Sequence, residues 1–379
     1  MENYKKIIKK SLALLLLLFI SVVAVFNLSS TDRSFSESEN RILEQLPPFS
    51  LKALLSGDFT VDFEKYVSDQ FIFRDFWIGA KNDTDRLMGK KESNGIYLGN
   101  NGYLIQEFNP PTKEDLKEKI DAIHAFNQAT PELQKYMMLV PTAAALYKDK
   151  LPKYAIIGDQ ETYLKKVQQM LQPNIRFIDV FPSLYAESNQ PIFYKTDHHW
   201  TTQGAYVAYL ELCRQMGLTP QTEEEFNIKQ VAAEFYGSLY SKSGFKHVRP
   251  DRMKLYLPKD QKKYTVTYVD EGKTTDSLYE MEQLQRKDKY AVFLNGNHAL
   301  IQIKTANTSG RKLLVVKDSY ANSLIPFLLN HFSEINVVDL RYYEEDLVTF
   351  VNEHGIQDML LLYNANTFFE DPFIKNLTE

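Results

Sequence analysis

Short apolar stretches alternate with stretches of helical spacing along much of this chain, and this alternation constrains the fold more than any other feature. The stretches typical of strands cover residues 136–141, 175–180, 311–316, 335–340 and 359–363. The helical patterns cover residues 113–128, 163–171, 202–216, 322–331 and 343–353. Such a rhythm is typical of a mostly parallel sheet with helices on both faces. We therefore predict an α/β fold.

Two regions precede or interrupt this pattern. Residues 31–95 begin polar and irregular and continue as an amphipathic stretch with aromatic residues at helical spacing, which predicts a helical lead-in. Two short strands around an Asn-Asn-Gly turn predict a hairpin at 96–105, and the main domain is expected to run from residue 96 to residue 379. The rhythm is lost between about 218 and 307, where we expect an insertion that carries loops and antiparallel strands over the site.

The N-terminus has the features of a membrane anchor. Four lysines within the first ten residues precede an uncharged stretch at 11–30 that is rich in Leu, Ile, Val and Phe. About 20 such residues are enough to cross a hydrocarbon core roughly 30 Å thick. The lysines favour a cytoplasmic N-terminus, so residues 1–30 are predicted to be a cytoplasmic stub and a transmembrane helix, with the rest of the chain extracellular. The alternative is a cleaved signal peptide, although the apolar run continues past the small residues at which cleavage would occur.

The most distinctive polar segment is Asp197-His198-His199-Trp200. Neighbouring side chains of an extended chain face opposite ways, so Asp197 and His199 are predicted to share one side and His198 to face the other. A carboxylate that orients an imidazole is the base half of a nucleophilic dyad. Trp200 is expected to form a wall of the site, and one of the two threonines after it to cap the next helix.

A base needs a nucleophile, and the best candidate is Ser319. It follows an apolar stretch and Asp318, directly before a helical pattern. Active groups of open α/β sheets collect at the carboxyl ends of strands, where we expect both Ser319 and His199. Backbone N–H groups and the helix dipole at such a turn would stabilise an oxyanion. An Asp-Ser pair is also an ordinary helix cap, so the assignment depends on Ser319 meeting His199.

Three further residues are candidates for binding the oxyanion or the substrate. Asn297 and the N–H group of Gly296 follow an apolar stretch and would complete an oxyanion hole, although a simple polar turn has the same residues. Arg341 follows the expected strand at 335–340, where an active-site cation would lie, but a surface arginine is common there too. His198 is expected to be structural, as are the four histidines in helices and in the insertion: His124, His247, His331 and His354.

Composition excludes several classes of function. The net charge is −5 and no Lys/Arg cluster follows the first ten residues, so nucleic acid is not an expected partner. The single cysteine, Cys213, excludes a structural zinc site built on cysteines and is expected to be a small buried side chain. No metal and no cofactor is predicted.

Five motifs together resemble the bacterial DHHW family: Phe35-Ser-x-x-Glu39-Asn40-Arg41, the Tyr97-to-Leu104 hairpin, Asp197-His198-His199-Trp200, Gly296-Asn297-His298 and Lys317-Asp318-Ser319-Tyr320. That family is in turn similar to the SGNH-hydrolase-like alginate O-acetyltransferases, in which an Asp-x-His motif precedes the nucleophilic serine. The resemblance implies an SGNH-like three-layer sandwich with Asp197 as the acid, His199 as the base and Ser319 as the nucleophile. Lys317 stands where many SGNH enzymes have the glycine that contributes to the oxyanion hole.

These features predict a membrane-anchored serine enzyme that transfers an acetyl group to a cell-surface polysaccharide. By the family resemblance, a membrane-bound O-acyltransferase partner would supply the acetyl group. Three alternatives stay open: a carbohydrate O-acetylesterase with water as the acceptor, a metal-dependent phosphoesterase with Asp197, His198 and His199 as ligands, and a non-catalytic glycan-binding module for export or assembly. The phosphoesterase would need further Asp or His clusters.

Overall fold

The computed structural model describes residues 2–36, 38–260 and 262–378. Two compact units make up the chain: Met1–Lys90 with Gly244–Lys246, and Lys91–Ser243 with His247–Glu379. Elements of the first unit are α1 (Glu2–Ser29), β1 (Phe35–Ser36), β2 (Arg41–Ile42), α2 (Leu51–Ser56), α3 (Asp58–Asp69) and α4 (Arg74–Leu87).

The first unit contains the apolar N-terminal helix and the helical lead-in. Within the described residues, α1 is the one helix long and apolar enough to cross a membrane, over Tyr4–Ser29. The predicted amphipathic stretch forms α3 and α4. Arg41, from the first of the five motifs, ties this unit together, since its Nη1 donates to Asp69 Oδ2 at 2.7 Å and its Nε to Glu39 at 2.7 Å.

The second unit is built on an eight-stranded sheet with the order β11-β10-β12-β14-β13-β15-β6-β7. Its strands are β6 (Gln134–Val140), β7 (Arg176–Phe177), β10 (Tyr264–Tyr268), β11 (Lys273–Thr275), β12 (Leu300–Thr305), β13 (Lys312–Lys317), β14 (Glu334–Val338) and β15 (Asp358–Asn364). The pairs from β14 through β13, β15 and β6 to β7 are parallel, whereas β12 pairs antiparallel with β14 and with β10, and β10 with β11. The predicted α/β character is confirmed; the sheet, predicted to be mostly parallel, is mixed, with a parallel part from β14 to β7 and an antiparallel edge from β12 to β11.

Two smaller groups of strands flank this sheet. They are the three-stranded sheet β3 (Glu92–Ser93), β4 (Ile96–Leu98) and β5 (Leu104–Gln106), and the antiparallel pair β8 (Phe226–Phe235) and β9 (Asp251–Pro258). The predicted hairpin is confirmed by the antiparallel pairing of β4 with β5. The stretch at 218–307 provides β8 and β9, and it also provides the antiparallel edge of the main sheet.

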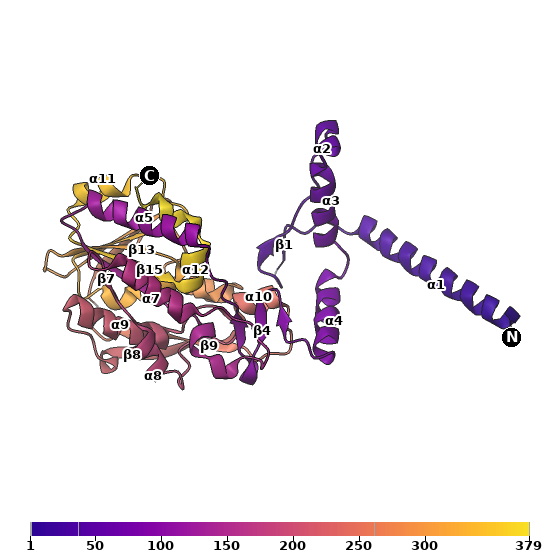
Figure 1. The fold of residues 1–379 in the computed structure, drawn as a ribbon, viewed down its shortest axis with the longest axis horizontal. Helices are drawn as coiled ribbons and strands as arrows, with labels where there is room; N and C mark the ends of the chain where they lie inside the picture. Colours follow the sequence, from indigo (N-terminus) through magenta and orange to yellow (C-terminus); the bar gives the residue numbers. More distant parts are fainter. Residues whose placement is uncertain (1, 37, 261, 379) are drawn as a thin grey trace. The chain divides into compact units, whose positions relative to one another are not determined.

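Helices pack on both faces of the main sheet. The helices of the second unit are α5 (Lys113–Ala129), α6 (Ala143–Leu146), α7 (Gln160–Leu171), α8 (Phe181–Ala186), α9 (Thr202–Met216), α10 (Ser238–Ser243), α11 (Leu347–His354) and α12 (Ala365–Glu370). Leu313 and Val315 of β13 belong to a buried cluster with residues of α8 and α9, whereas Leu314 and Val316 belong to a second cluster with residues of α5, α7 and α11. Figure 1 shows α5 and α11 on one side of the sheet and α8 and α9 on the other.

Short 3₁₀ segments complete the second unit: η1 (Asn100–Gly102), η2 (Lys148–Lys150), η3 (Glu223–Glu225), η4 (Met281–Gln285), η5 (Lys289–Val292), η6 (Ser319–Ser323), η7 (Ile325–Leu328) and η8 (Pro372–Thr378). The predicted helix at 322–331 is wrong, because η6 and η7 occupy this stretch. Pro326 has no N–H for an α-helical bond and its ring would clash with the preceding turn, so one continuous α-helix is unfavourable here.

Candidate functional site

Ser319 lies at the turn that follows β13, beside the end of the parallel strand β15. The N–H of Asp318 donates to the carbonyl oxygen of Leu362 at 3.1 Å, and its carboxylate accepts the N–H groups of Tyr320 and Asn364, both at 2.9 Å. Asp318 is buried, and this burial raises the pKa of its carboxyl group. These bonds hold the turn in place and leave Ser319 partly exposed.

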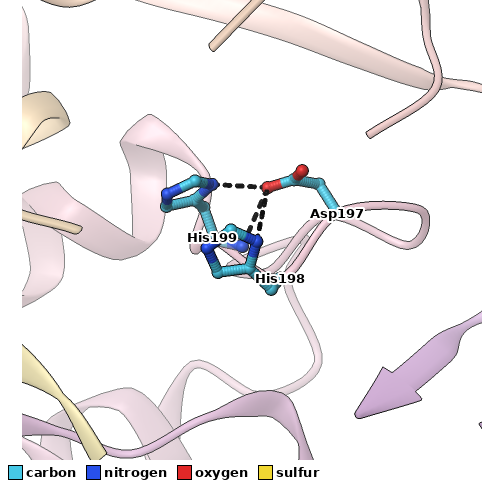
Figure 2. Close-up of side chains that lie close together, drawn as sticks. All are labelled: Asp197, His198 and His199. Carbon is cyan, nitrogen blue, oxygen red and sulfur yellow. Dashed lines mark hydrogen bonds and ion pairs between the residues drawn. The ribbon is translucent and has the colours of Figure 1, made fainter. Parts of the chain in front are cut away.

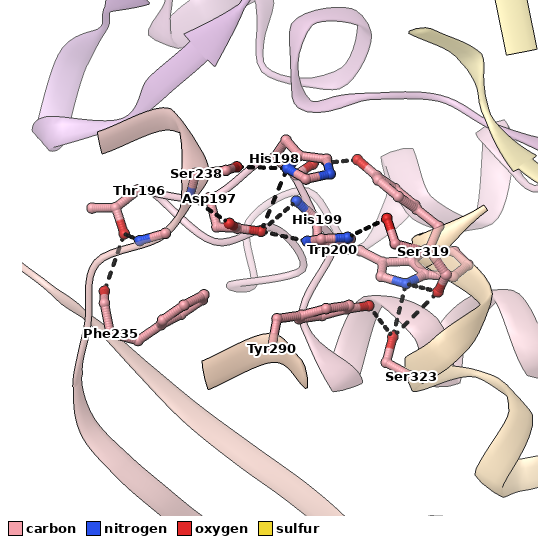
Figure 3. A network of polar contacts seen from close by, with 12 residues as sticks. Thr196, Asp197, His198, His199, Trp200, Phe235, Ser238, Tyr290, Ser319 and Ser323 are labelled. Atoms are coloured by element: carbon pink, nitrogen blue, oxygen red, sulfur yellow. Dashed lines mark hydrogen bonds and ion pairs between the residues drawn. The ribbon is translucent and has the colours of Figure 1, made fainter. Parts of the chain in front are cut away.

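The structure brings Ser319 together with Asp197 and His199. Nδ1 of His199 lies 2.6 Å from Oδ1 of Asp197, which also accepts the backbone N–H of His199 at 2.9 Å (Figure 2). A proton on Nδ1 shared with the carboxylate leaves Nε2 as the acceptor. This Nε2 lies 2.7 Å from Oγ of Ser319 (Figure 3). The contacts therefore form a continuous path from carboxylate to hydroxyl.

Asp197 is enclosed by the segment before and within α10. Oδ2 of Asp197 accepts the N–H of Ser238 at 2.8 Å. Burial alone would raise the pKa of Asp197, but the charges of His199 and His198 and the hydrogen bonds to the carboxylate lower it below its usual value. A Cβ added at Gly237 would lie 2.2 Å from Cβ of Asp197, so only glycine lets the chain approach this closely.

Tyr290 supports the imidazole from one face. Its ring is parallel to that of His199, with 3.6 Å between centroids and 9° between planes. Its hydroxyl donates to Oγ of Ser323 at 2.9 Å, which anchors the ring (Figure 3). Sequence reasoning missed Tyr290, because it lies in the irregular stretch at 218–307 and belongs to none of the five motifs.

The prediction that His198 faces away from His199 is wrong. The chain bends at these residues instead of running extended. The two imidazole rings are therefore neighbours, with centroids 3.8 Å apart. Nδ1 of His198 lies 2.6 Å from Oγ of Ser238, and burial together with the nearby His199 lowers the pKa of His198.

Trp200 lies beneath the site and does not form the predicted wall. It is fully buried, and its Nε1 donates to the carbonyl oxygen of Tyr320 and to Oγ of Ser323, both at 2.9 Å. Trp200 thus supports the turn that carries the serine. The predicted cap of the next helix is confirmed for Thr201, whose side chain accepts the N–H of Gly204.

Of the two predicted oxyanion donors other than Ser319, one is wrong. The N–H of Gly296 donates to the carbonyl oxygen of Phe293 at 3.1 Å, so it is already used within its own turn. The carboxamide oxygen of Asn297 accepts from Nζ of Lys317 at 2.6 Å and from Nδ2 of Asn322 at 3.2 Å. Because the oxygen is held in this way, the amide nitrogen of Asn297 is directed elsewhere, and within the described residues it has no hydrogen-bond partner.

Lys317 is the centre of a buried charge cluster. It is fully buried, and its Nζ lies 3.5 Å from Oδ2 of Asp339. Asp339 also accepts two bonds from Arg341, at 2.8 and 2.6 Å. Burial lowers the pKa of Lys317 to about 8. Arg341, predicted as an active-site cation, thus pairs with Asp339. Lys317, at the position where many SGNH enzymes have glycine, holds the side chain of Asn297 in place.

The ligand atoms of Asp197, His198 and His199 lie within 4.8 Å of one another, which is close enough for a shared metal ion. Their polar atoms nevertheless have protein partners, because His199 contacts Asp197 and Ser319, and His198 contacts Ser238. The donor set therefore fits a hydrogen-bonded relay better than a ligand set.

The other predicted structural residues bond within the fold. Nε2 of His124 lies 3.0 Å from the carbonyl oxygen of Met170, and Nδ1 of His354 lies 3.0 Å from that of Phe350. Nε2 of His331 lies 2.8 Å from the hydroxyl of Tyr209. Cys213 is buried, as expected.

A cavity of about 250 Å³ lies beside the relay. Its lining includes Asp197, His198, Ser238, Tyr320 and Asn366. The carboxylate and imidazole side of the site therefore adjoins a space in which a small polar group fits.

Comparisons with known proteins agree with the resemblance seen in the sequence. The structure is similar to that of a DHHW family protein from Eubacterium siraeum DSM 15702, with 25% identity and a TM-score of 0.66 over 75% of this chain and 96% of that one. It is similar to Bacillus cereus PatB1 with a sulfonyl adduct, with 20% identity and a TM-score of 0.64 over 73% and 97%. The O-acetyltransferase domain of Pseudomonas putida AlgJ matches with 18% identity and a TM-score of 0.46 over 73% and 92%.

No curated protein matches the sequence. The family model of the DHHW protein, in contrast, matches residues 97–338, which is more than half of the chain and includes both segments of the site. The predicted family resemblance is thereby confirmed, and the chain belongs to the DHHW protein family.

Proposed function

We propose that this protein is a membrane-anchored, extracytoplasmic serine enzyme that transfers an acetyl group to a cell-surface polysaccharide. The observation that carries the proposal is the path from Asp197 through His199 to Ser319, with contacts of 2.6 and 2.7 Å. The family resemblance supports acetyl transfer, and α1 supports a single-pass anchor. In this proposal residues 1–30 form the stub and anchor, 31–95 the lead-in and 96–379 an SGNH-like catalytic domain.

In the first half of the reaction, Oγ of Ser319 attacks the carbonyl carbon of an acetyl ester. The hydroxyl proton passes to Nε2 of His199, and the carboxylate of Asp197 stabilises the imidazolium that forms. The N–H of Ser319 and the amide nitrogen of Asn297 donate to the carbonyl oxygen as it gains negative charge. His199 then gives the proton to the leaving oxygen, and the acetyl group stays on Ser319.

In the second half, a sugar hydroxyl attacks the acetyl-serine. His199 takes the proton of the sugar hydroxyl, the carbonyl reforms on the sugar ester, and the same proton returns to Oγ of Ser319. The cavity beside Asp197 and His198 would admit the acceptor. The donor would be an acetyl group delivered by a membrane-bound O-acyltransferase, because this domain would work outside the cell.

The test of the reaction uses the full chain purified in detergent with 4-nitrophenyl acetate as donor. Ser319→Ala should lower turnover at least ~10³-fold, because loss of a triad member leaves only binding and the oxyanion donors. Ser183→Ala, on α8, is the matched control and should turn over like the wild type. Circular dichroism checks that both variants fold. Wild-type turnover in folded Ser319→Ala would exclude this mechanism.

Transfer is separated from hydrolysis by the product. With an oligosaccharide acceptor in the same assay, mass spectrometry should detect acetylated sugar that is absent without enzyme. Release of free acetate alone, at the same rate with and without acceptor, would identify an esterase instead.

A further inference from the structure

The second unit contains a cavity of about 1570 Å³ that the proposed chemistry does not use. Its lining combines cations with aromatic rings: Tyr103, Lys148, Lys150, Tyr185, Lys195 and Arg249. The combination matters because cations attract acidic ligands and aromatic faces suit sugar rings.

Two of these lysines flank one aromatic ring. Nζ of Lys150 lies 4.6 Å from the ring centroid of Tyr103 and 3.0 Å from that of Tyr147. Nζ of Lys195 lies 5.2 Å from the same Tyr103 ring. Both ammonium groups therefore lie close to the same Tyr103 ring. Burial lowers the pKa of Lys150; the charge of Asp149 opposes this effect, and the charge of Lys195 adds to it.

The positive charge of this lining is not balanced by the protein. Within the described residues, no carboxylate lies within 4.0 Å of the charged groups of Lys148, Lys150, Lys195 or Arg249. The lining has two acidic residues, Asp149 and Glu161, and Glu161 already pairs with Lys165 at 2.7 Å. The lining therefore has four cationic side chains and two acidic ones, and one of the acidic side chains, Glu161, is neutralised by Lys165. The cavity thus has an excess of positive charge.

Another part of the lining offers an aromatic surface. Tyr185 of α8 is 60% exposed, so its ring is accessible to a ligand. It stacks on Phe181 with 6.2 Å between centroids and 9° between planes. Such a supported ring presents a flat apolar face on which a sugar can lie without the ring first being ordered.

The cavity is physically connected to the catalytic segment through Lys195. The backbone N–H groups of Lys195 and Thr196 donate to the carboxylate of Asp251 at 2.9 and 2.8 Å. Lys195 therefore stands at a fixed position two residues before Asp197. A ligand held by Lys195 lies against the same rigid segment that carries the proposed acid and base.

We infer that this cavity binds an acidic stretch of the acceptor glycan, with its anionic groups at Lys150 and Lys195 and a sugar ring on Tyr185. The inference rests on the proposed function for the nature of the ligand. It adds that the acceptor carries carboxylate or phosphate groups, which both offer negative oxygens to a lysine pair.

Binding of defined oligomers to the full chain in detergent tests this inference. The probes are a hexamer of galacturonate, an oligomer of glycerol phosphate and, as the neutral control, maltohexaose. One of the two acidic probes should bind at least about tenfold more tightly than maltohexaose, and more salt should weaken it because surface charge is screened. The acidic probe that binds identifies carboxylate or phosphate as the source of the charge.

Variants assign the binding to the cavity. The double variant Lys150→Gln, Lys195→Gln should lose at least about tenfold of the affinity for the acidic probe, since each lost charge costs a charge-assisted contact. Lys150→Arg, Lys195→Arg keeps the charge and should retain most of the affinity. Lys117→Gln, which removes an exposed charge on α5, should bind like the wild type. Equal affinity for acidic and neutral probes, or an unchanged double Gln variant, overturns the inference.

A failure of this inference can be distinguished from a failure of the proposed catalytic function. The same preparation is assayed for turnover of 4-nitrophenyl acetate. Turnover without binding of either acidic probe removes this inference and leaves the proposed function. If the chain binds an acidic probe but does not turn over 4-nitrophenyl acetate, the cavity is supported as a glycan site and the proposed catalytic function is excluded.

Discussion

Oγ of Ser319 lies 2.7 Å from Nε2 of His199, although the two residues are 120 positions apart in the chain. The serine is placed by the turn after β13, and the imidazole by a bend that α9 and Tyr290 hold in position. This one contact joins two motifs that have no local relation in the sequence. The proposed enzyme function rests on this contact.

The carboxylate of Asp197 should be needed for its charge and its effect on the tautomer of His199. Asp197→Asn keeps the shape of the side chain, but its amide would favour the wrong tautomer, and we expect kcat for 4-nitrophenyl acetate to fall by about 10⁴-fold. The melting temperature checks that the variant folds. A loss of less than tenfold would show that His199 does not depend on Asp197.

Lys317 and Asn297 should act as one unit. Lys317→Met leaves the carboxamide of Asn297 without its partner at 2.6 Å, so both Lys317→Met and Asn297→Ala should lower kcat by roughly 10²-fold, the cost of one oxyanion donor. KM should change little, because the contact forms to the transition state. The double variant should be no worse than either single variant. Additive losses would contradict the coupling of these two residues.

The close approach of Gly237 to Asp197 gives a prediction about stability and activity together. In Gly237→Ala, the new Cβ would lie 2.2 Å from Cβ of Asp197, so the segment must shift and the relay with it. We expect a loss of stability of about 1–3 kcal/mol and a clear fall in turnover. Gly79→Ala is the control, since its Cβ would meet just one side-chain atom, at 3.9 Å. Equal stability of the two variants would contradict the geometry.

Burial of Lys317 predicts a pH dependence of stability. The pKa of Lys317 is about 8 in the folded protein, against an ordinary value of 10.5. Between these values the unfolded chain binds more protons, so the contribution of Lys317 to the free energy of unfolding rises as the pH increases from about 8 to 10.5. The free energy of unfolding of the wild type relative to Lys317→Met should rise over this range. A difference that is constant with pH, as expected for an exposed lysine whose pKa is the same in the folded and unfolded chain, would argue against a buried ammonium.

The parts of the fold predicted from the sequence are those with a local signal. The alternation of apolar and amphipathic stretches located the strands and helices, with ends that differ by a few residues. The α-helix predicted after Ser319 does not form, because Pro326 interrupts the helical pattern. Antiparallel strands are predicted at 218–307, but their pairing with the main sheet through β10 and β12 is not, because that stretch lacks the regular rhythm.

The site follows the same rule. Asp197, His199 and Ser319 could be predicted to meet because a base needs a nucleophile. Of these residues, Ser319 follows a strand of the main sheet as expected, whereas Asp197 and His199 lie in a bend between α8 and α9. Gly296 is not an oxyanion donor because a turn uses its N–H, and His198 does not face away from His199 because a bend replaces the extended chain. The stacking of Tyr290 on His199 and the hydrogen bond from Lys317 to Asn297 are contacts between distant segments, which no local sequence pattern encodes.

The most direct measurement is the mass of the protein after reaction with phenylmethanesulfonyl fluoride, which sulfonylates activated serines. The wild type should gain one sulfonyl group, located by peptide mass spectrometry on Ser319, and His199→Ala should gain it far more slowly. A wild-type chain that stays unmodified, or one modified at another residue while Ser319 stays free, would contradict the assignment of Ser319 as a nucleophile activated by His199.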